Sequence, residues 1–257
     1  MKRKLLSFAL VLAMVLAIFP VSAFATYDNG DFRYEIALRD TPEESFVVIA
    51  HLNDPNRTSV EIPKTIDGIT VREIDICAFQ DTKIQSIDIP ETIVSIGEQA
   101  FRGCRDLKEV NFEGDSIELG ERCFENCISL ESIWVPACGI VPKGAFRACS
   151  NLTAAVIDEG SYIIDQGAFE CCDSLKYIYI PTSMDVIYTA YTFRNVTDLV
   201  VAGIPGYKEL SAGQALAEKM GFTFQAVDYP AGENAVFPDV DGGHYYSLPV
   251  LWEATNG

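Results

Sequence analysis

A phenylalanine recurs at a nearly constant interval through the middle of this chain. The spacings between its consecutive copies are 22, 23, 22, 23 and 24 residues, and the copies are Phe79, Phe101, Phe124, Phe146, Phe169 and Phe193. A fixed period of this length is typical of repeat architectures, in which one unit alone cannot bury its apolar side. The period therefore predicts a stack of similar units, with each phenylalanine lying on its counterpart in the next unit.

The rest of the repeat predicts one short strand per unit. The consensus is roughly I-x-x-[AC]-F-x-x-C-x-x-L-x-x-[IVA]-x-[IVF]-P, and its leucines are Leu107, Leu130, Leu152 and Leu175. Alternating apolar positions after the leucine indicate a strand with one buried face, and the proline ends it because proline cannot donate the next ladder hydrogen bond. The A-F-x-x-C part has the spacing of one helical turn. We expect an elongated, β-rich, right-handed solenoid with a parallel sheet and short helical turns.

These units resemble the BspA-like leucine-rich repeats of exported bacterial proteins, whose period falls in the leucine-rich repeat range. The resemblance extends over roughly residues 30–227. It implies about six units of 22–24 residues over 70–203, after an N-terminal entry and capping segment over 26–69. The end units carry Thr82 and Val196 in place of the repeat cysteine, as expected of atypical terminal repeats.

The resemblance also implies a small C-terminal α/β cap over 204–227. Its expected elements are a short helix near Ser211–Met220 and a strand at Phe222–Val227. Such a cap would cover the last apolar surface of the stack.

The first 25 residues have the pattern of a secretory signal peptide. A basic start at Lys2-Arg3-Lys4 precedes an apolar run from Leu5 to Phe19, and Ala23-Phe24-Ala25 fits an A-x-A cleavage site. A membrane anchor is the alternative, but the apolar run is short for a span. We therefore expect cleavage after Ala25 and a mature chain that is soluble outside the cytoplasm.

The charge balance argues against two classes of partner. Without residues 1–25 the chain has 16 Lys and Arg against 37 Asp and Glu, a net charge of −21, compared with −18 for the whole chain. A surface this acidic repels phosphate backbones and anionic lipid headgroups. We expect no nucleic-acid partner and, after signal cleavage, no membrane partner.

The eight cysteines first suggest disulfides in a chain predicted to be exported. However, four of them follow the repeat phenylalanine by three residues and should stack in one interior column: Cys104, Cys127, Cys149 and Cys172. Cys123 replaces a small alanine, and in both places cysteine acts as a small buried hydrophobe. We expect buried thiols, although bridges along the column stay geometrically possible. Three cysteines lie outside the column: Cys77, Cys138 and Cys171.

No residue pattern indicates a catalytic or metal site. The sequence has no C-x-x-C, H-E-x-x-H or G-x-S-x-G motif, and its 37 carboxylates make chance acidic pairs certain. His51 lies in an apolar N-terminal segment, and the column thiols should be buried and unactivated. A thiol-dependent hydrolase is thus a remote alternative. We expect no enzymatic activity, no cofactor and no metal.

The outward positions of the predicted strands favour a binding surface. One outward column carries Asp88, Asn111, Trp134, Val156 and Tyr179, and its neighbour carries Ser86, Glu109, Ser132, Ala154 and Tyr177. Five of these should form one apolar and aromatic patch: Trp134, Ala154, Val156, Tyr177 and Tyr179. Clustered exposed aromatics indicate a partner, here a protein or a glycan. Alternatively, loops or another domain cover the patch, or the aromatics stiffen the sheet through cross-strand contacts.

Residues 237–257 follow a short linker at 228–236 and resemble the opening of an S-layer homology module. The matching residues are Phe237, Asp239, Val240, His244, Tyr245, Val250, Trp252 and Gly257. A calcium loop at Asp239–Gly242 is disfavoured because its later ligands are missing. Modules of that family attach proteins to cell-wall polysaccharide, but only about the first 20 residues of one are present. We expect this segment not to bind wall polymer as it stands, although its aromatics would permit partial docking onto the solenoid.

Together these patterns predict an exported bacterial cell-surface protein with a leucine-rich repeat solenoid. We expect a non-catalytic binding or adhesion module for protein or glycan partners, associated with the cell wall. A passive spacer or structural element of the wall is the alternative.

Overall fold

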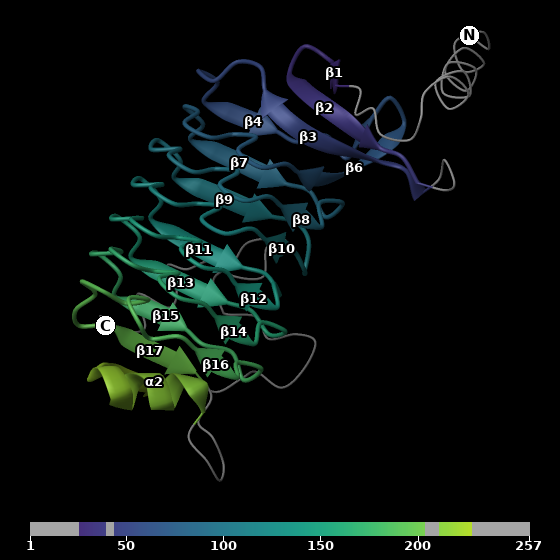
Figure 1. The fold of residues 1–257 in the computed structure, drawn as a ribbon. Helices are drawn as coiled ribbons and strands as arrows, with labels where there is room; N and C mark the ends of the chain where they lie inside the picture. Colours follow the sequence, from purple (N-terminus) through teal and green to yellow (C-terminus); the bar gives the residue numbers. More distant parts are fainter. Residues whose placement is uncertain (1–25, 40–43, 204–210, 228–257) are drawn as a thin grey trace, which may run out of the picture.

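The computed structural model describes residues 26–39, 44–203 and 211–227, which form an elongated stack of coils with β1 at one end and α2 at the other (Figure 1). The predicted solenoid of parallel strands, with a small helix and strand at its C-terminal end, is confirmed. The segments interpreted as signal peptide (1–25), linker (228–236) and S-layer homology segment (237–257) lie outside the described residues.

The stack begins with an antiparallel sheet formed by β1 (Thr26–Asp28), β2 (Phe32–Ala37) and β3 (Phe46–Leu52). β3 then pairs parallel with β6 (Ile69–Ile74), and β5 (Thr65–Ile66) pairs antiparallel with β6. The change from antiparallel to parallel pairing at β3 joins this N-terminal sheet to the first coil.

Each coil contributes a longer and a shorter strand, and the two sets form separate parallel arrays (Figure 1). The longer strands are β4 (Ser59–Glu61), β7 (Ser86–Ile89), β9 (Glu109–Phe112), β11 (Ser132–Val135), β13 (Ala154–Ile157), β15 (Tyr177–Tyr179) and β17 (Val200–Gly203). The shorter strands, which continue from β6, are β8 (Ser95–Ile96), β10 (Glu118–Leu119), β12 (Ile140–Val141), β14 (Ile163–Ile164) and β16 (Val186–Ile187).

The repeat phenylalanines form one continuous column of stacked rings. From Phe79 to Phe193, consecutive ring centroids lie 4.9, 5.0, 5.6, 5.3 and 6.0 Å apart, with interplanar angles between 2° and 15°. The repeat leucines beside them are fully buried: Leu107, Leu130, Leu152 and Leu175. Because coils stack at about the strand spacing, the same position in each coil meets its own counterpart.

Edge-on rings close both ends of this column. Phe32 of β2 meets Phe79 at 6.3 Å, and Phe222 meets Phe193 at 6.0 Å. Phe222 follows α2 (Ala212–Met220), which begins at a Ser211 capping box, and it leads into β18 (Thr223–Ala226), which pairs with β17. Each end of the solenoid is therefore covered by a non-repeat element.

Both parallel arrays are interrupted at one junction. Among the described strands no ladder joins β9 to β11 or β10 to β12. Phe112 occupies the last core position of β9, where β7 and β13 carry Ile89 and Ile157. Turn hydrogen bonds still connect the two coils, because the N–H of Phe101 donates to the carbonyl of Cys123 at 2.8 Å.

A ladder of alternating charges runs along the turns. From Phe101 onward, the residue after each repeat phenylalanine is, in order, Arg102, Glu125, Arg147, Glu170 and Arg194, and each contacts the next across adjacent coils at 3.0, 3.1, 3.1 and 3.5 Å. The arginines are substantially exposed, so each pair contributes at most about 1 kcal/mol.

We expect Gly120→Ala to destabilise the solenoid by about 1–3 kcal/mol through overpacking. A Cβ at Gly120 would lie 2.4 Å from the backbone nitrogen of Glu98 in the preceding coil. Urea unfolding measures the loss. Gly213→Ala is the matched control, because its Cβ would meet ordinary 3.4 Å contacts and a helical alanine is favoured over glycine. A Gly120→Ala protein as stable as the wild type would contradict the close coil contact.

Candidate functional site

The structure aligns the predicted patch residues in two columns on the outward side of the longer strands. Trp134 pairs with Val156 and Val156 with Tyr179, while Ala154 pairs with Tyr177. The register between strands is thus the one expected from the repeat spacing. Three adjacent strands, β11, β13 and β15, carry all five side chains (Figure 1).

The exposure of these residues differs from the expectation. Trp134, Ala154 and Tyr179 are half-buried, but Val156 and Tyr177 are buried, at 5% and 7% exposure. Neither of these two belongs to the continuous core cluster, so they are buried on the outward side of the sheet. Val156 lies between the larger side chains of Trp134 and Tyr179 on the neighbouring strands, which shield it. The expectation of an openly exposed patch is corrected at these two positions.

Tyr177 is the most unusual member of the patch. Its hydroxyl is buried and has no hydrogen-bond partner within the described part of the chain. Burial raises the pKa of this hydroxyl to about 12. A buried tyrosine hydroxyl usually has a hydrogen-bond partner, so the Tyr177 hydroxyl departs from the usual arrangement.

The same outward face is polar in the N-terminal coils. On β7 and β9 the equivalent positions include Asp88 and Asn111, whose side chains are joined by a 2.9 Å hydrogen bond, and the exposed Glu109. Trp134 begins the aromatic half, and its ring lies edge-on to Phe112 with centroids 6.4 Å apart. The face therefore changes from polar to apolar at the junction between β9 and β11.

A second apolar surface lies on the shorter strands, where sequence reasoning assigned no site. Ile140, Ile163 and Val186 pair across β12, β14 and β16. The large hydrophobic side chains exposed on these strands or close to them in the chain are Ile140, Tyr162, Val186, Tyr188 and Tyr191. The sequence signal was the first member of each short apolar pair, which faces outward while the second faces the core. We call these five residues the short-strand surface.

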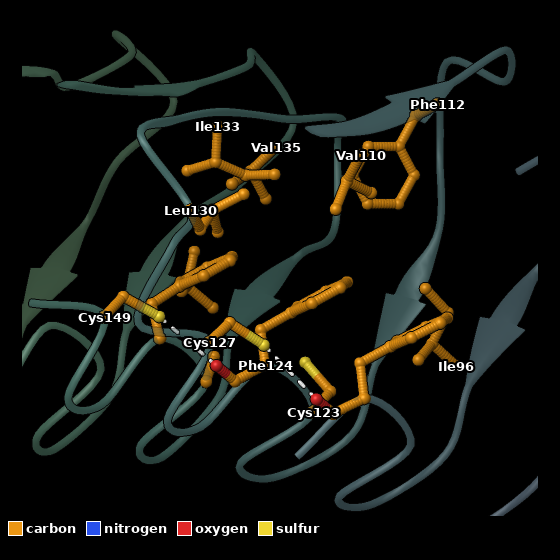
Figure 2. Close-up of a cluster of buried hydrophobic side chains, with 14 of the residues drawn as sticks. Ile96, Val110, Phe112, Cys123, Phe124, Cys127, Leu130, Ile133, Val135 and Cys149 are labelled. Carbon is orange, nitrogen blue, oxygen red and sulfur yellow. Dashed lines mark hydrogen bonds between the residues drawn. The ribbon is translucent and has the colours of Figure 1, made fainter. Parts of the chain in front are cut away.

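The cysteine column is a set of hydrogen-bonded buried thiols (Figure 2). Each Sγ donates to the carbonyl of the repeat phenylalanine in the preceding coil, at 3.0–3.2 Å, from Cys104, Cys127, Cys149 and Cys172. Burial raises the pKa of Cys104 to about 11 and that of Cys149 to about 12. These thiols stay protonated at neutral pH, and a protonated buried thiol is a poor nucleophile.

The remaining cysteines are also free thiols. Cys123 and Cys138 are buried, whereas Cys77 and Cys171 are half-buried at turn positions with φ of 58° and 60°. Their left-handed backbone turns these two side chains away from the column. His51 lies on β3 opposite Arg33, in the antiparallel sheet before the first cysteine of the column.

The described ranges give no indication of a metal site or of a membrane-spanning helix. There, no group of three or more His, Cys, Asp or Glu side chains is arranged to hold a metal ion. The same ranges contain no helix that is both long and apolar enough to span a bilayer. The residues matching the S-layer homology pattern, from Phe237 to Gly257, lie outside them.

Parallel coils with buried leucine, phenylalanine and cysteine columns define a leucine-rich repeat protein. The family described as BspA type leucine rich repeat region matches residues 72–200 in six copies, and this chain belongs to that family. The match ends at residue 200, so the resemblance of residues 237–257 to an S-layer homology module stays a prediction.

Two solved structures share the fold. The chain is 20% identical to a leucine-rich repeat protein of T. pallidum, with a TM-score of 0.54, covering 78% of this chain and 98% of that one. It is 23% identical to a leucine rich cell surface protein of Faecalibacterium prausnitzii, also with a TM-score of 0.54, covering 72% of this chain and 56% of that one. The comparison with curated proteins gives no match.

Proposed function

We propose that this chain is a non-catalytic binding or adhesion module at a bacterial cell surface, which holds a protein or glycan partner on the outward face of β11, β13 and β15. The observation that carries the proposal is the column Trp134–Val156–Tyr179 beside Ala154–Tyr177, an aromatic surface on a rigid sheet. Aromatic side chains of this kind dominate the affinity of interfaces.

Family membership supports a surface location, as does the description of the Faecalibacterium relative as a cell surface protein. Export would be directed by residues 1–25, and residues 237–257 would begin a wall anchor. Cell-wall polymer would be a partner only if that anchor module were complete. A passive spacer is the alternative function.

The test is the double variant Trp134→Ala/Tyr179→Ala. Partners would first be isolated by crosslinking to surface extracts and by glycan arrays, and their affinities then measured with purified protein. We expect the variant to lose about 2 kcal/mol or more of binding free energy, roughly 30-fold in affinity, because two aromatic anchors are removed.

The matched control is Tyr162→Ala/Tyr188→Ala, which removes two aromatics from the short-strand surface. It should leave the affinity unchanged, and circular dichroism should show both variants folded. Equal binding by the Trp134→Ala/Tyr179→Ala protein and the wild type would refute the proposed face. Loss of binding only in the control variant would move the site to the short-strand surface, and no partner in any assay would favour the spacer.

A further inference from the structure

An open cavity lies at the N-terminal end of the solenoid, where the turn between β1 and β2 faces β4 and β5 (Figure 1). Its volume is about 810 Å³, within the range of about 300–1,000 Å³ that is usual for cavities that hold small ligands. The residues that line it include Asp31, Arg57, Ser59, Glu61, Thr65 and Asp67. Polar side chains from three separate segments of the chain therefore surround one space.

Contacts within the protein already hold several of these polar groups in place. Oδ1 of Asn29 accepts a hydrogen bond from the backbone N–H of Asp31 at 3.1 Å, which fixes the turn between β1 and β2. Nη2 of Arg57 forms an ion pair with Oδ1 of Asp31 at 2.7 Å. On the other side of the cavity, the hydroxyl of Tyr34 donates to Oδ2 of Asp67 at 3.0 Å. Polar groups that are positioned in advance lose less conformational entropy when a ligand binds.

The lining offers hydrogen-bond donors and acceptors together, which is the chemistry that sugar hydroxyls match. The guanidinium of Arg57 only donates, the carboxylates of Glu61 and Asp67 only accept, and the hydroxyls of Ser59 and Thr65 do both. A sugar hydroxyl also donates and accepts, so a saccharide can pair with all three kinds of group. The ammonium groups of a basic peptide only donate, and they would leave Arg57 without a match.

The charge of the lining disfavours acidic ligands. Three carboxylates, those of Asp31, Glu61 and Asp67, surround the cavity with the one guanidinium of Arg57, which gives a net charge of −2. The chain as a whole has the same sign, with a net charge of −18. A uronic acid would therefore be repelled from the cavity, whereas an amino sugar would be attracted to it.

We propose that this cavity binds a saccharide without acidic groups, and that it prefers amino sugars. The site goes beyond the function proposed above, because the cavity shares no residue with the outward face of β11, β13 and β15. Either site can therefore be present without the other, and the experiments distinguish them.

The test is calorimetric titration of the purified full chain with an oligomer of glucosamine, at a mildly acidic pH where its amino groups are charged. The double variant Glu61→Ala/Thr65→Ala removes exposed side chains from two sides of the cavity. It should lower the affinity about tenfold or more, because the ligand loses hydrogen bonds to a charged and a neutral group. The matched control, Glu109→Ala/Thr223→Ala, removes the same residue types from exposed strand positions outside the cavity and should bind as the wild type does.

Three further ligands test the chemical class. An oligomer of N-acetylglucosamine should bind more weakly than the glucosamine oligomer, and an oligomer of galacturonic acid should not bind. No binding of the glucosamine oligomer, or equal binding by Glu61→Ala/Thr65→Ala and the wild type, would overturn the proposal. An oligolysine peptide that binds as tightly and is weakened by the same variant would also overturn it, by assigning the cavity to a basic peptide. Circular dichroism checks that each variant is folded, and Trp134→Ala/Tyr179→Ala should bind the glucosamine oligomer normally.

Discussion

Replacing Phe124 with alanine should destabilise the solenoid by about 3–5 kcal/mol, the cost of removing a fully buried ring from a core. Phe124 is stacked between Phe101 and Phe146, at centroid distances of 5.0 and 5.6 Å, and is completely buried. The coil that contains it meets the preceding coil at the junction where no ladder joins β9 to β11 or β10 to β12 in the described structure. The stacked phenylalanine rings therefore contribute much of the contact between the coils before this junction and the coils after it.

Repeat proteins gain stability largely from contacts between neighbouring units, so weakening one interface can uncouple the units on either side. We expect the single unfolding transition of the wild type to split into two in Phe124→Ala, seen by urea unfolding with circular dichroism. Phe169→Ala is the control, because it removes an equivalent ring where β13, β15 and β17 remain paired. The Phe169→Ala variant should lose a similar amount of stability but still unfold in a single transition. Two transitions in both variants, or in neither, would contradict a special role for the junction.

Alkaline pH should unfold this protein through its buried thiols. Burial raises the pKa of Cys104 to about 11 and of Cys149 to about 12, and it raises the pKa values of Cys123, Cys127 and Cys172 as well. The ordinary thiol pKa is 9.0. A pKa that is higher in the folded state contributes stability below the unfolded-state pKa, and this contribution is lost as pH rises towards the folded-state pKa.

The expected loss is about 1.4 kcal/mol per pH unit for each thiol, beginning near the ordinary thiol pKa. Five thiols together should remove several kcal/mol within about one pH unit above that point. Urea unfolding at a series of pH values measures the slope. In the control variant Cys127→Ser/Cys149→Ser, the hydroxyls can still donate to the carbonyls of Phe101 and Phe124 but do not titrate in this range. Its slope should be shallower by about 3 kcal/mol per pH unit, and an unchanged slope would show that other groups cause the alkaline loss.

The fold was predictable because the pattern of buried and exposed residues that defines it is complete within one repeat period. Whether a side chain such as Leu130 or Cys127 is buried depends on the residues a few positions away and on the identical residues one coil above and below. The interruption between β9 and β11 was not predictable in the same way. At this junction β9 ends on Phe112, where the repeat pattern accepts any large apolar side chain, and nothing in the pattern marks a break there.

The sequence signalled the turn conformation in only some units, where Gly144 and Gly167 stand two residues before a repeat phenylalanine with φ of 64° and 69°. Gln99, Arg122 and Tyr191 each stand two residues before a repeat phenylalanine with φ between 55° and 66°. These residue types do not signal a left-handed backbone, which glycine or asparagine would have done. The stack imposes the conformation because each turn must hydrogen-bond to the next one.

The candidate surface was predicted correctly in register but not in exposure. Register follows from the period, which sets Trp134 beside Val156 and Val156 beside Tyr179. Exposure of Tyr177 depends on what lies over the sheet, and no pattern within the repeat contains that information. The exposed tyrosines of the short-strand surface were missed because the short strands were interpreted only through their buried members.

By itself, the sequence determined the period, the columns of phenylalanine, cysteine and leucine, and hence the solenoid. Identical side chains at fixed offsets can all be buried only if their units stack. The tertiary structure decided where the sheets break, which turn residues adopt left-handed backbone, and which outward residues meet water. These features depend on contacts between coils and on elements outside the repeat. The fold could be predicted because its contacts join residues about one period apart, whereas the exposure of a surface residue depends on contacts with the whole molecule.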